Sequence, residues 1–283
     1  MATKLINPTS PGRRQMTFAD FGDLSKVRPH KRLARGQKKQ SGRSRTSGTI
    51  TVRHRGGGHK RLYRQIDFRG TDKLGVPGTV ATIEYDPNRT ARIALVRYAD
   101  GDQRYVLAPE GLKVGDPVVC NDRTKVKTGN RMMLQHIPQG YKIYNVELKL
   151  GRGGAIVRSA GGFATLVGFD EAFAIVQMPS GEVRRVHKEC YASIGTVGNI
   201  DHNLVSIGKA GRTRWMGRKP QVLGKSMNAV DHPHGGGEGH SSIGLVKGPK
   251  TKWGKKARGV KTRPRNKASN RLIVRRRITK HRR

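Results

Sequence analysis

Short runs of alternating apolar and polar residues fill the middle of the chain. Three of them, TVATIEY from residue 79, ARIALVRY from residue 91 and QRYVLAP from residue 103, are separated by DPNR and ADGD. β-Branched and aromatic residues at a spacing of two, interrupted by Asp, Asn, Pro and Gly, are typical of antiparallel hairpins. The apolar run VVC from residue 118 follows a Gly-Asp-Pro turn and is expected to add a closing strand. We therefore predict a small β-barrel over residues 67–125.

A second β-unit is predicted over residues 126–195, after a polar joint at 121–130. Short strands at close spacing suit a compact five-stranded barrel, and only one or two helical turns are expected anywhere. The core is thus predicted to be all β. The strands of this second unit are expected at residues 143–150, 163–167, 173–178 and 182–186, with Pro-Ser-Gly between the last two.

The two ends of the chain carry most of the charge. Residues 1–66 have a net charge of +15 and residues 196–283 of +20, against 0 for residues 67–125 and +4 for residues 126–195. The ends are rich in Gly, Ser, Pro and Asn and have few apolar runs, so they bury too little surface to offset chain entropy. We predict long irregular basic extensions that are mobile alone and fold against phosphate. Solvated basic tails are the alternative.

The total charge indicates a polyanionic partner. With 58 Lys and Arg against 19 Asp and Glu, the net charge is +39, and a compact protein with that excess repels itself unless a polyanion such as nucleic acid balances it. A membrane surface is the weaker candidate, because no apolar run approaches the ~18 residues of a spanning helix. The start of the chain lacks the apolar core of a secretory signal, so a cytoplasmic location is expected, with an organelle as the alternative. Cys120 and Cys190 lack the paired spacing of a zinc or redox motif and are expected to be buried.

A run of cations surrounds three consecutive glycines near the end of the N-terminal extension. Glycine permits positive φ and removes side-chain bulk, so backbone N–H groups can approach phosphate oxygens while arginines supply bidentate contacts. The segment is predicted to grip phosphate, and a flexible turn between strands is the alternative. The predicted RNA contacts are Arg53, His54, Arg55, Gly56, Gly57, Gly58, His59, Lys60, Arg61 and Arg64.

A second cationic segment, GRTRWMGRKP from residue 211, contains one tryptophan. An exposed Trp beside arginine can stack on an unpaired base, as RNA readers often require. Equally, this Trp can plug the end of a barrel, and the sequence leaves both open. The predicted RNA contacts here are Arg212, Arg214, Trp215, Arg218 and Lys219.

The most specific segment is MNAVDHPHGGGEG from residue 227. Two histidines beside an acid could in principle form a metal site or an acid–base pair. We expect neither, because histidines two apart with Pro between them share no helical face and no apolar run beside them builds a dry pocket. The predicted role is RNA contact, with the imidazoles donating hydrogen bonds and the glycines allowing close approach. The residues concerned are Asn228, Asp231, His232, His234, Gly235, Gly236 and Gly237.

The remaining basic tail is predicted to contact RNA as well, although its charge also fits a nuclear-localisation patch. The GKS triplet at residue 224 ends like a phosphate-binding loop, but Lys219 stands where that motif requires glycine, so nucleotide hydrolysis is unsupported. The tail residues predicted to bind RNA are Lys255, Lys256, Arg263, Arg275, Arg276 and Arg277, in a basic run that continues to Lys280.

Several of these stretches resemble the universal large-subunit ribosomal protein family L-two (L2), in its bacterial or organellar form. They are RHRGGGHKRLYRQIDF from residue 53, IEYDPNR from 83, LGRGG from 150, MPSGEVRRV from 178, GNIDHN from 198, IGKAGRTRW from 207 and MNAVDHPHGGGEG from 227. The resemblance runs through nearly the whole chain. Three positions depart from the family pattern: Ala229 stands where Pro is usual, Leu223 where Arg is usual, and Lys252 where Pro commonly precedes Trp-Gly.

The resemblance implies an OB-fold barrel followed by an SH3-like barrel, with extensions threaded into large-subunit rRNA. It implies a primary rRNA binder near the peptidyl transferase centre that supports subunit association and tRNA placement in translation. The implied partners are large-subunit rRNA, small-subunit rRNA at the subunit interface and other ribosomal proteins, with no membrane and no homo-oligomer. No cofactor is expected, and Mg²⁺ only through the bound rRNA.

Two rival functions remain at this stage. In the first, the chain is an enzyme in which His232 or His234 acts as general base for acyl transfer, in the loop that the resemblance associates with peptide-bond formation. In the second, it is a DNA-compacting protein, which its charge alone would allow. The sequence shows no helix-turn-helix, zipper or zinc-finger spacing with which to read a duplex. We expect no catalytic residue and no metal site.

Overall fold

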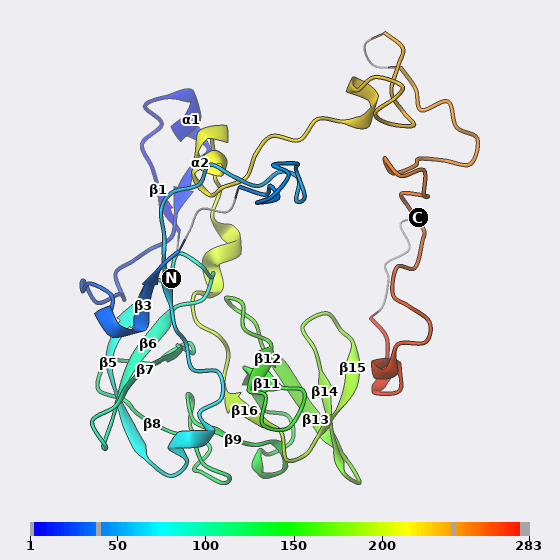
Figure 1. Cartoon of the computed structure of the whole chain (residues 1–283). Coiled ribbons are helices and arrows are strands. Elements are labelled where there is room, and N and C mark those ends of the chain that lie inside the picture. Colours follow the sequence, from blue (N-terminus) through cyan, green and yellow to red (C-terminus); the bar gives the residue numbers. More distant parts are fainter. Residues whose placement is uncertain (1–2, 38–40, 239–240, 278–283) are drawn as a thin grey trace. The chain divides into compact units, whose positions relative to one another are not determined.

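The computed structural model describes residues 3–37, 41–238 and 241–277 (Figure 1). Its internal contacts divide the chain into two units. The first unit comprises residues 1–38, 60–212 and 271–283, and the second comprises residues 39–59 and 213–270. The first unit holds both large β-sheets, and the second is almost free of regular structure.

The first sheet consists of antiparallel hairpins, as predicted. Its strands lie in the order β7-β6-β5-β8, and Val80 faces Val96 across the first hairpin. Strand β8, the predicted closing strand, pairs with the start of β5, where Pro77 faces Val119. The four strands are β5 (Pro77–Glu84), β6 (Ile93–Tyr98), β7 (Gln103–Leu107) and β8 (Pro117–Val119).

Asp86 explains the turn between β5 and β6. Its side chain is fully buried, accepts the Asn88 N–H at 2.9 Å and pairs with the Arg89 Nε at 2.7 Å. An Asx side chain that bonds the backbone two residues on stabilises a turn. The turn also holds the chain that follows the glycine segment. The Asn88 side-chain amide donates to the Leu62 carbonyl, and the Arg61 guanidinium donates to the Pro87 carbonyl.

The second sheet is the larger one, in the order β17-β15-β14-β13-β10-β16-β9. Three of its predicted strands are confirmed within a few residues, and the fourth prediction, one strand over residues 143–150, is wrong. That strand ends at Tyr144 because Asn145 has a positive φ of 49°, and the chain continues as the separate pair β11 (Val146–Glu147) and β12 (Gly154–Ile156). The sheet strands are β9 (Arg131–Met133), β10 (Lys142–Tyr144), β13 (Ala164–Asp170), β14 (Phe173–Gln177), β15 (Val183–His187), β16 (Tyr191–Ile194) and β17 (Ile273–Arg275).

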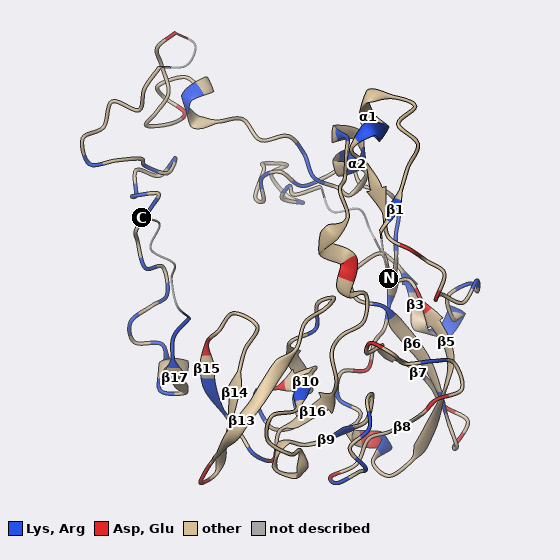
Figure 2. Ribbon diagram, turned by 180° about the vertical axis from the view of Figure 1, so that it is seen from behind, with Lys and Arg blue, Asp and Glu red and all other residues tan. Residues whose placement is uncertain are grey.

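Strand β17 comes from the far end of the chain. Ile273 and Arg275 pair with Arg184 and Val183, and the Leu272 carbonyl accepts the Arg185 N–H at 2.7 Å. The C-terminal extension therefore returns to the β core and covers the exposed edge of β15 (Figure 2). An edge strand left open presents unpaired N–H and C=O groups, so this pairing protects the sheet.

The few helices are short. The two α-helices are α1 (Pro11–Arg14) and α2 (Ala210–Trp215), and no described helix has the length and apolar character to cross a membrane. The 3₁₀ turns span Lys31–Leu33, Thr71–Lys73, Leu134–His136, Ile200–Leu204, Gly224–Ser226 and Ala268–Asn270. Small strand pairs are β1 (Lys4–Leu5) with β2 (Thr17–Phe18), and β3 (Ala34–Gly36) with β4 (Leu62–Arg64).

The hydrophobic core lies within the β sheets of the first unit. One cluster, which includes Met132, Leu134 and Leu166, fills the second sheet, and a separate cluster around Val80 and Val96 lies against the first. No described residue after Gly198 is buried. The predicted class is confirmed: an all-β core with long irregular basic extensions. Among the described residues, the hydrogen-bond ladders of both large sheets remain open.

A buried polar chain ties the N-terminal extension to the core. The fully buried Tyr105 donates its hydroxyl to Glu84 Oε2 at 2.8 Å and accepts the His30 N–H at 2.9 Å. Burial raises the pKa of Tyr105, so this phenol remains a donor at neutral pH. Glu84 is itself only 4% exposed, and its other carboxylate oxygen accepts the Thr82 hydroxyl.

Replacing Tyr105 with Phe removes the donor and leaves a buried carboxylate oxygen without a partner. We expect Y105F to lower the free energy of unfolding by about 1–3 kcal/mol, the usual cost of an unsatisfied buried group. Urea denaturation followed by circular dichroism measures the change. Y141F is the matched control, because the Tyr141 side chain is 44% exposed; equal stabilities of the two variants would contradict the assignment.

Candidate nucleic-acid interface

Positive charge is distributed differently in the core and in the extensions. Figure 2 shows Lys and Arg recurring along both extensions, with Asp and Glu mostly on the sheets and their turns. Residues 67–125 hold as many acids as bases, whereas the extensions hold few acids. A cation that an acid already binds is not available to phosphate, so the position of the acids decides which cations can bind RNA.

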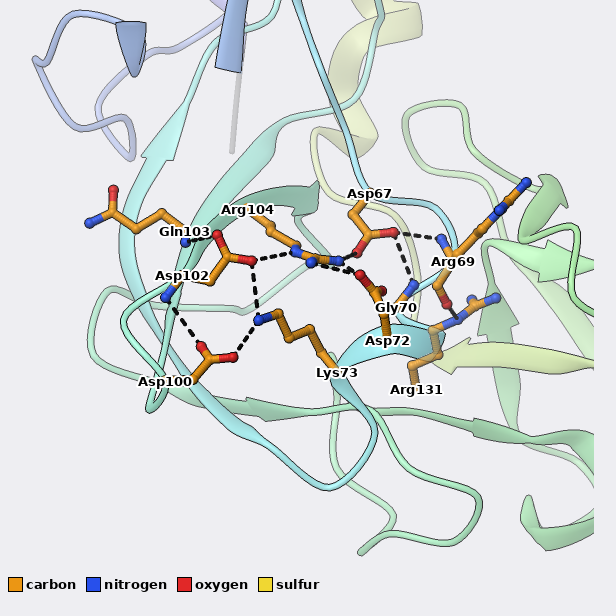
Figure 3. A network of polar contacts seen from close by, with 10 residues as sticks. All are labelled: Asp67, Arg69, Gly70, Asp72, Lys73, Asp100, Asp102, Gln103, Arg104 and Arg131. Carbon is orange, nitrogen blue, oxygen red and sulfur yellow. Dashed lines mark hydrogen bonds and ion pairs between the residues drawn. The ribbon is translucent and has the colours of Figure 1, made fainter. Parts of the chain in front are cut away.

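The acids beside the first sheet form ion pairs with two cations of the protein (Figure 3). Arg104 contacts Asp67 at 2.9 Å, Asp72 at 2.7 Å and Asp102 at 3.0 Å. Lys73 pairs with Asp100 and with Asp102. Hydrogen bonds from Arg104 lower the pKa of Asp72 and of Asp102, and the Lys73 hydrogen bond lowers the pKa of Asp100. The two cations at this end of the core are therefore neutralised within the protein.

In the second unit, backbone hydrogen bonds join the triple-glycine segment to the cationic segment that contains Trp215. The Gly56 N–H donates to the Gly217 carbonyl at 3.0 Å, the His59 N–H to the Trp215 carbonyl at 2.9 Å, and the Lys219 N–H to the His54 carbonyl at 3.1 Å. We call residues 53–59 with residues 215–220 the glycine clamp. Segments that lie 166 residues apart in sequence thus form one structure.

Glycines are required in the clamp for close approach. A Cβ on Gly58 would lie 3.0 Å from the Gly217 Cα, and Gly56 has a φ of +136°, which residues with a side chain rarely adopt. Gly57 has open space around it but a φ of +68°, which side chains rarely adopt. The Gly56 N–H, expected to approach phosphate, donates within the protein instead. The triplet therefore builds the clamp, and the arginines and lysine remain for phosphate.

Cations and one aromatic ring project from the clamp. Arg55, Arg218 and Lys219 are exposed, and the Trp215 side chain is 60% exposed. An exposed aromatic ring beside arginines is suited to base stacking, and the role of Trp215 stays a prediction. Arg53 stacks on Trp253, its guanidinium carbon 5.5 Å from the ring centroid. This contact was not predicted from the sequence, where nothing connects position 53 with position 253.

Other predicted RNA contacts are engaged by the protein itself. Arg64 is buried and donates to the Leu62 carbonyl, and Arg61 donates to Pro87. Arg212 is half-buried; it donates to the Thr17 carbonyl at 3.0 Å, and its guanidinium carbon lies 4.6 Å from the Phe18 ring centroid. Of the remaining predicted contacts near these segments, His54 donates from Nδ1 to the Pro220 carbonyl, and His59, Lys60 and Arg214 are exposed.

The histidine loop, residues 223–237, folds around its two imidazoles. His232 Nδ1 accepts the His234 N–H at 3.0 Å, and His234 Nε2 accepts the Lys250 N–H at 2.8 Å. A ring nitrogen that accepts carries no proton, so the proton of each neutral ring lies on its other nitrogen. The ring centroids are 4.8 Å apart. Each imidazole therefore stabilises the loop and keeps one N–H available for donation.

Glycine is also required inside the histidine loop. A Cβ on Gly235 would lie 2.1 Å from the Asn228 carbonyl oxygen, and the same carbonyl accepts the Asp231 and His232 N–H groups. Gly236 and Gly237 have φ of +85° and +82°. Asn228 and Asp231 themselves are exposed. The loop is a compact turn with polar groups at its surface.

The described histidines of the loop contact backbone groups and not the neighbouring carboxylate. No hydrogen bond joins the Asp231 carboxylate to either imidazole in the described part of the loop. No group of three or more His, Cys, Asp or Glu that could hold a metal ion occurs among residues 3–37, 41–238 and 241–277. Both cysteines are buried, and burial raises the pKa of the Cys120 thiol to about 11 and that of Cys190 to about 12. They are poor nucleophiles at neutral pH.

The tail residues belong to different units, with Lys255, Lys256 and Arg263 in the second and the later arginines in the first. Lys255, Lys256, Arg276 and Arg277 are exposed, and Arg275 belongs to β17. Arg263 donates to Asn270 Oδ1 at 2.6 Å and to Ser269 Oγ at 2.8 Å. The predicted basic run from Ile278 to Lys280, and Gly239 at the end of the histidine motif, lie outside the described residues.

Comparison with known families returns two matches that together cover most of the chain. Residues 30–120 match the family model described as Ribosomal Proteins L2, RNA binding N-terminal domain. Residues 127–254 match the model described as Ribosomal Proteins L2, C-terminal domain. The matches include the first sheet, most of the second, the glycine clamp and the histidine loop. They agree with an OB-fold domain followed by an SH3-like domain, whose sheets both lie within the first unit.

Acid stability tests whether the ion-pair network is structural. Carboxyl pKa values that are lower in the folded than in the unfolded chain add stability above about pH 4, and that stability is lost as pH falls through the folded values. We expect R104M to lower the urea midpoint at pH 7, and the difference from the unmodified chain to shrink as the pH falls below about 4.

R97M is the control for this comparison, because Arg97 is exposed on β6 and forms no ion pair with a described residue. A difference between R104M and the unmodified chain that stays constant from pH 7 to about pH 3 would show that the network contributes nothing through its carboxylates.

Proposed function

The chain belongs to the L2 family of ribosomal proteins, and from this premise we propose that it is a primary rRNA-binding protein whose extensions grip phosphates while its β core recognises folded RNA. A structural, RNA-binding role in the large ribosomal subunit follows from the family itself. The proposal concerns which residues do the binding and how.

The glycine clamp is the observation that carries the proposal. Backbone hydrogen bonds hold its two segments together. The side chains of Arg53, Arg55, Arg218 and Lys219 are exposed, and none of them forms an ion pair with a described residue. Guanidinium groups held in a fixed geometry bind phosphate oxygens bidentately. Trp215 adds a face on which an unpaired base can stack.

The extensions and the core have different parts in this binding. We propose modules at residues 67–125 and 126–195, flanked by basic extensions at 1–66 and 196–283. The core neutralises most of its own charge, which suits recognition of RNA shape. The extensions carry a net charge of +35, and each phosphate they neutralise releases condensed counterions. We expect the extensions to supply most of the affinity for RNA, and the core to set the orientation of the protein on the RNA.

The finer roles are proposals as well. We propose that the histidine loop supports the architecture of the peptidyl transferase centre, and that the protein aids subunit association and tRNA placement through small-subunit rRNA and other ribosomal proteins. Its compact, internally bonded form supports a scaffolding role. We propose no cofactor beyond Mg²⁺ held by the rRNA, no homo-oligomer, and a ribosome of the cytoplasm, with an organellar ribosome as the alternative.

Direct catalysis by the histidine loop is the second candidate function. The family is a structural one, and the acceptor nitrogens of both imidazoles are occupied by backbone N–H groups. A general base must accept a proton from the substrate, and these nitrogens already accept bonds that hold the loop. We propose that the loop acts on structure and not on bond formation.

RNA binding by the full-length chain should depend steeply on salt. We expect affinity for large-subunit rRNA to fall on the order of 10³-fold between about 50 and about 200 mM salt. Replacing Arg55 and Arg218 with Gln should lower the slope of log K against log salt by about 1 for each phosphate that the variant no longer neutralises. Filter binding at several salt concentrations measures both quantities.

R104Q is the matched control, because Arg104 already pairs with three carboxylates. A change in slope as large for R104Q as for the clamp variants would remove the clamp from the interface. Competition by duplex DNA as effective as that by rRNA would instead favour a nonspecific DNA-compacting protein.

The catalytic alternative is tested in assembled ribosomes. Loss of a general base costs about 10²–10⁴ in rate, whereas loss of a loop-stabilising imidazole should reduce assembly. We expect H232Q and H234Q particles to form peptide bonds at unchanged rates once assembled, with fewer particles formed for both variants. A drop of about 10²-fold in the single-turnover rate of intact particles would support catalysis.

A further inference from the structure

A pocket on the first unit differs in character from the rest of this cationic chain. It is a cavity of about 500 Å³, formed where residues 19–23, 108–114 and 198–201 meet. Its wall includes the buried side chains of Ala108 and Leu112. Val114 and Ile200 line it as well and are 56% and 51% exposed. The pocket therefore offers apolar surface that the fold leaves uncovered.

Acidic residues gather around this pocket although acids are scarce nearby. Asp20 and Asp23 are the only acids in residues 1–66, and both line it. Glu110 and Asp201 line it as well, and Asp201 is one of only three acids in residues 196–283. The lining cations are Arg92 and Lys113. In a chain of net charge +39, this is a locally acidic site.

Some of this charge is balanced within the protein and some is not. Asp20 pairs with Lys4 at 2.8 Å. Arg92 is 8% exposed, donates to the Asp20 carbonyl at 2.8 Å and lies 4.8 Å from the centroid of the Phe21 ring, so it forms part of the wall. Neither Asp23 nor Glu110 forms an ion pair with another described residue. Burial lowers the pKa of Arg92 and the charge of Asp23 acts to raise it, so Asp23 is partly balanced without a direct ion pair, and both carboxylates can still bind a cation of a partner.

Charge complementarity decides between RNA and protein as the occupant. Phosphate would meet like charge at this pocket while unpaired cations lie elsewhere on the same chain. A lysine or arginine side chain suits it better, because its methylene stem covers apolar surface while its charged end reaches a carboxylate. The volume lies within the range of about 300–1,000 Å³ usual for binding sites.

We propose that this pocket is a protein-docking site that receives a basic segment, with alternating cationic and aliphatic residues, from a second protein of the ribosomal particle. The placement of the partner in the particle rests on the proposed function. The chemistry of recognition rests on the pocket alone. The exposed faces of Val114 and Ile200 receive the aliphatic residues, and Asp23 and Glu110 bind the cations.

The first experiment identifies the occupant in assembled large subunits. A photo-crosslinking amino acid replaces Val114, and mass spectrometry identifies what it captures; the same amino acid at Val126, which is 41% exposed and outside the pocket, is the control. We expect a Lys- or Arg-containing peptide of another ribosomal protein from position 114 only. Capture of rRNA, or of nothing, from position 114 would overturn the proposal.

The second experiment tests recognition without the ribosome. The full-length protein is titrated at about 150 mM salt, which limits charge effects to about 8 Å, with the peptide acetyl-Lys-Leu-Arg-Leu-Lys-amide and with acetyl-Glu-Leu-Glu-Leu-Glu-amide. We expect only the basic peptide to bind, and D23N and E110Q each to weaken it about two- to fivefold, as for exposed ion pairs.

E238Q is the matched variant, because Glu238 is exposed and lies outside the pocket. Equal binding of both peptides, or equal affinities of D23N, E110Q and E238Q for the basic peptide, would overturn the proposal whatever the outcome for rRNA. Loss of salt-dependent rRNA binding with intact peptide recognition would instead contradict the proposed function alone.

Discussion

Repulsion among unbalanced cations is the constraint on which this structure depends. A folded core tolerates positive charge only where carboxylates lie close by, and Arg104 with three of them shows how the β core meets this condition. The extensions have no such supply of acids, and no described residue after Gly198 is buried. Folding of the core and the proposed binding of polyanion by the extensions are two answers to the same electrostatic problem.

Cationic segments repel each other, and glycine allows their backbones to come into contact in the absence of RNA. In the clamp the contacts are made by backbone groups, and the side chains of Arg55 and Arg218 project away from a shared ladder. Dipolar N–H and C=O groups attract each other regardless of side-chain charge, provided that no Cβ separates them. The histidine loop uses the same device at Gly235 and adds two imidazoles as acceptors.

The sequence predicted the all-β class, the hairpins of the first sheet and the basic extensions, because these depend on local alternation and composition. It predicted one continuous strand over 143–150, where a positive φ at Asn145 breaks the ladder, and no local pattern marks that residue. It assigned Arg61, Arg64 and Arg212 to RNA from their charge; each also donates to a carbonyl of the protein, and their contact with RNA stays a prediction. Pairings across long stretches of sequence, such as Arg53 with Trp253, depend on tertiary structure and were missed.

Because β17 pairs with β15, the C-terminal extension is held to the rest of the protein at two points. Residues 213–270 are attached to the β core at both ends, since Arg212 bonds Thr17 and Ile273 pairs with Arg184. They form a closed loop and not a free tail, and tethering both ends removes conformations before any ligand is present. If RNA binds this segment as proposed, it orders a chain whose freedom is already reduced, so less of the binding energy is offset by entropy.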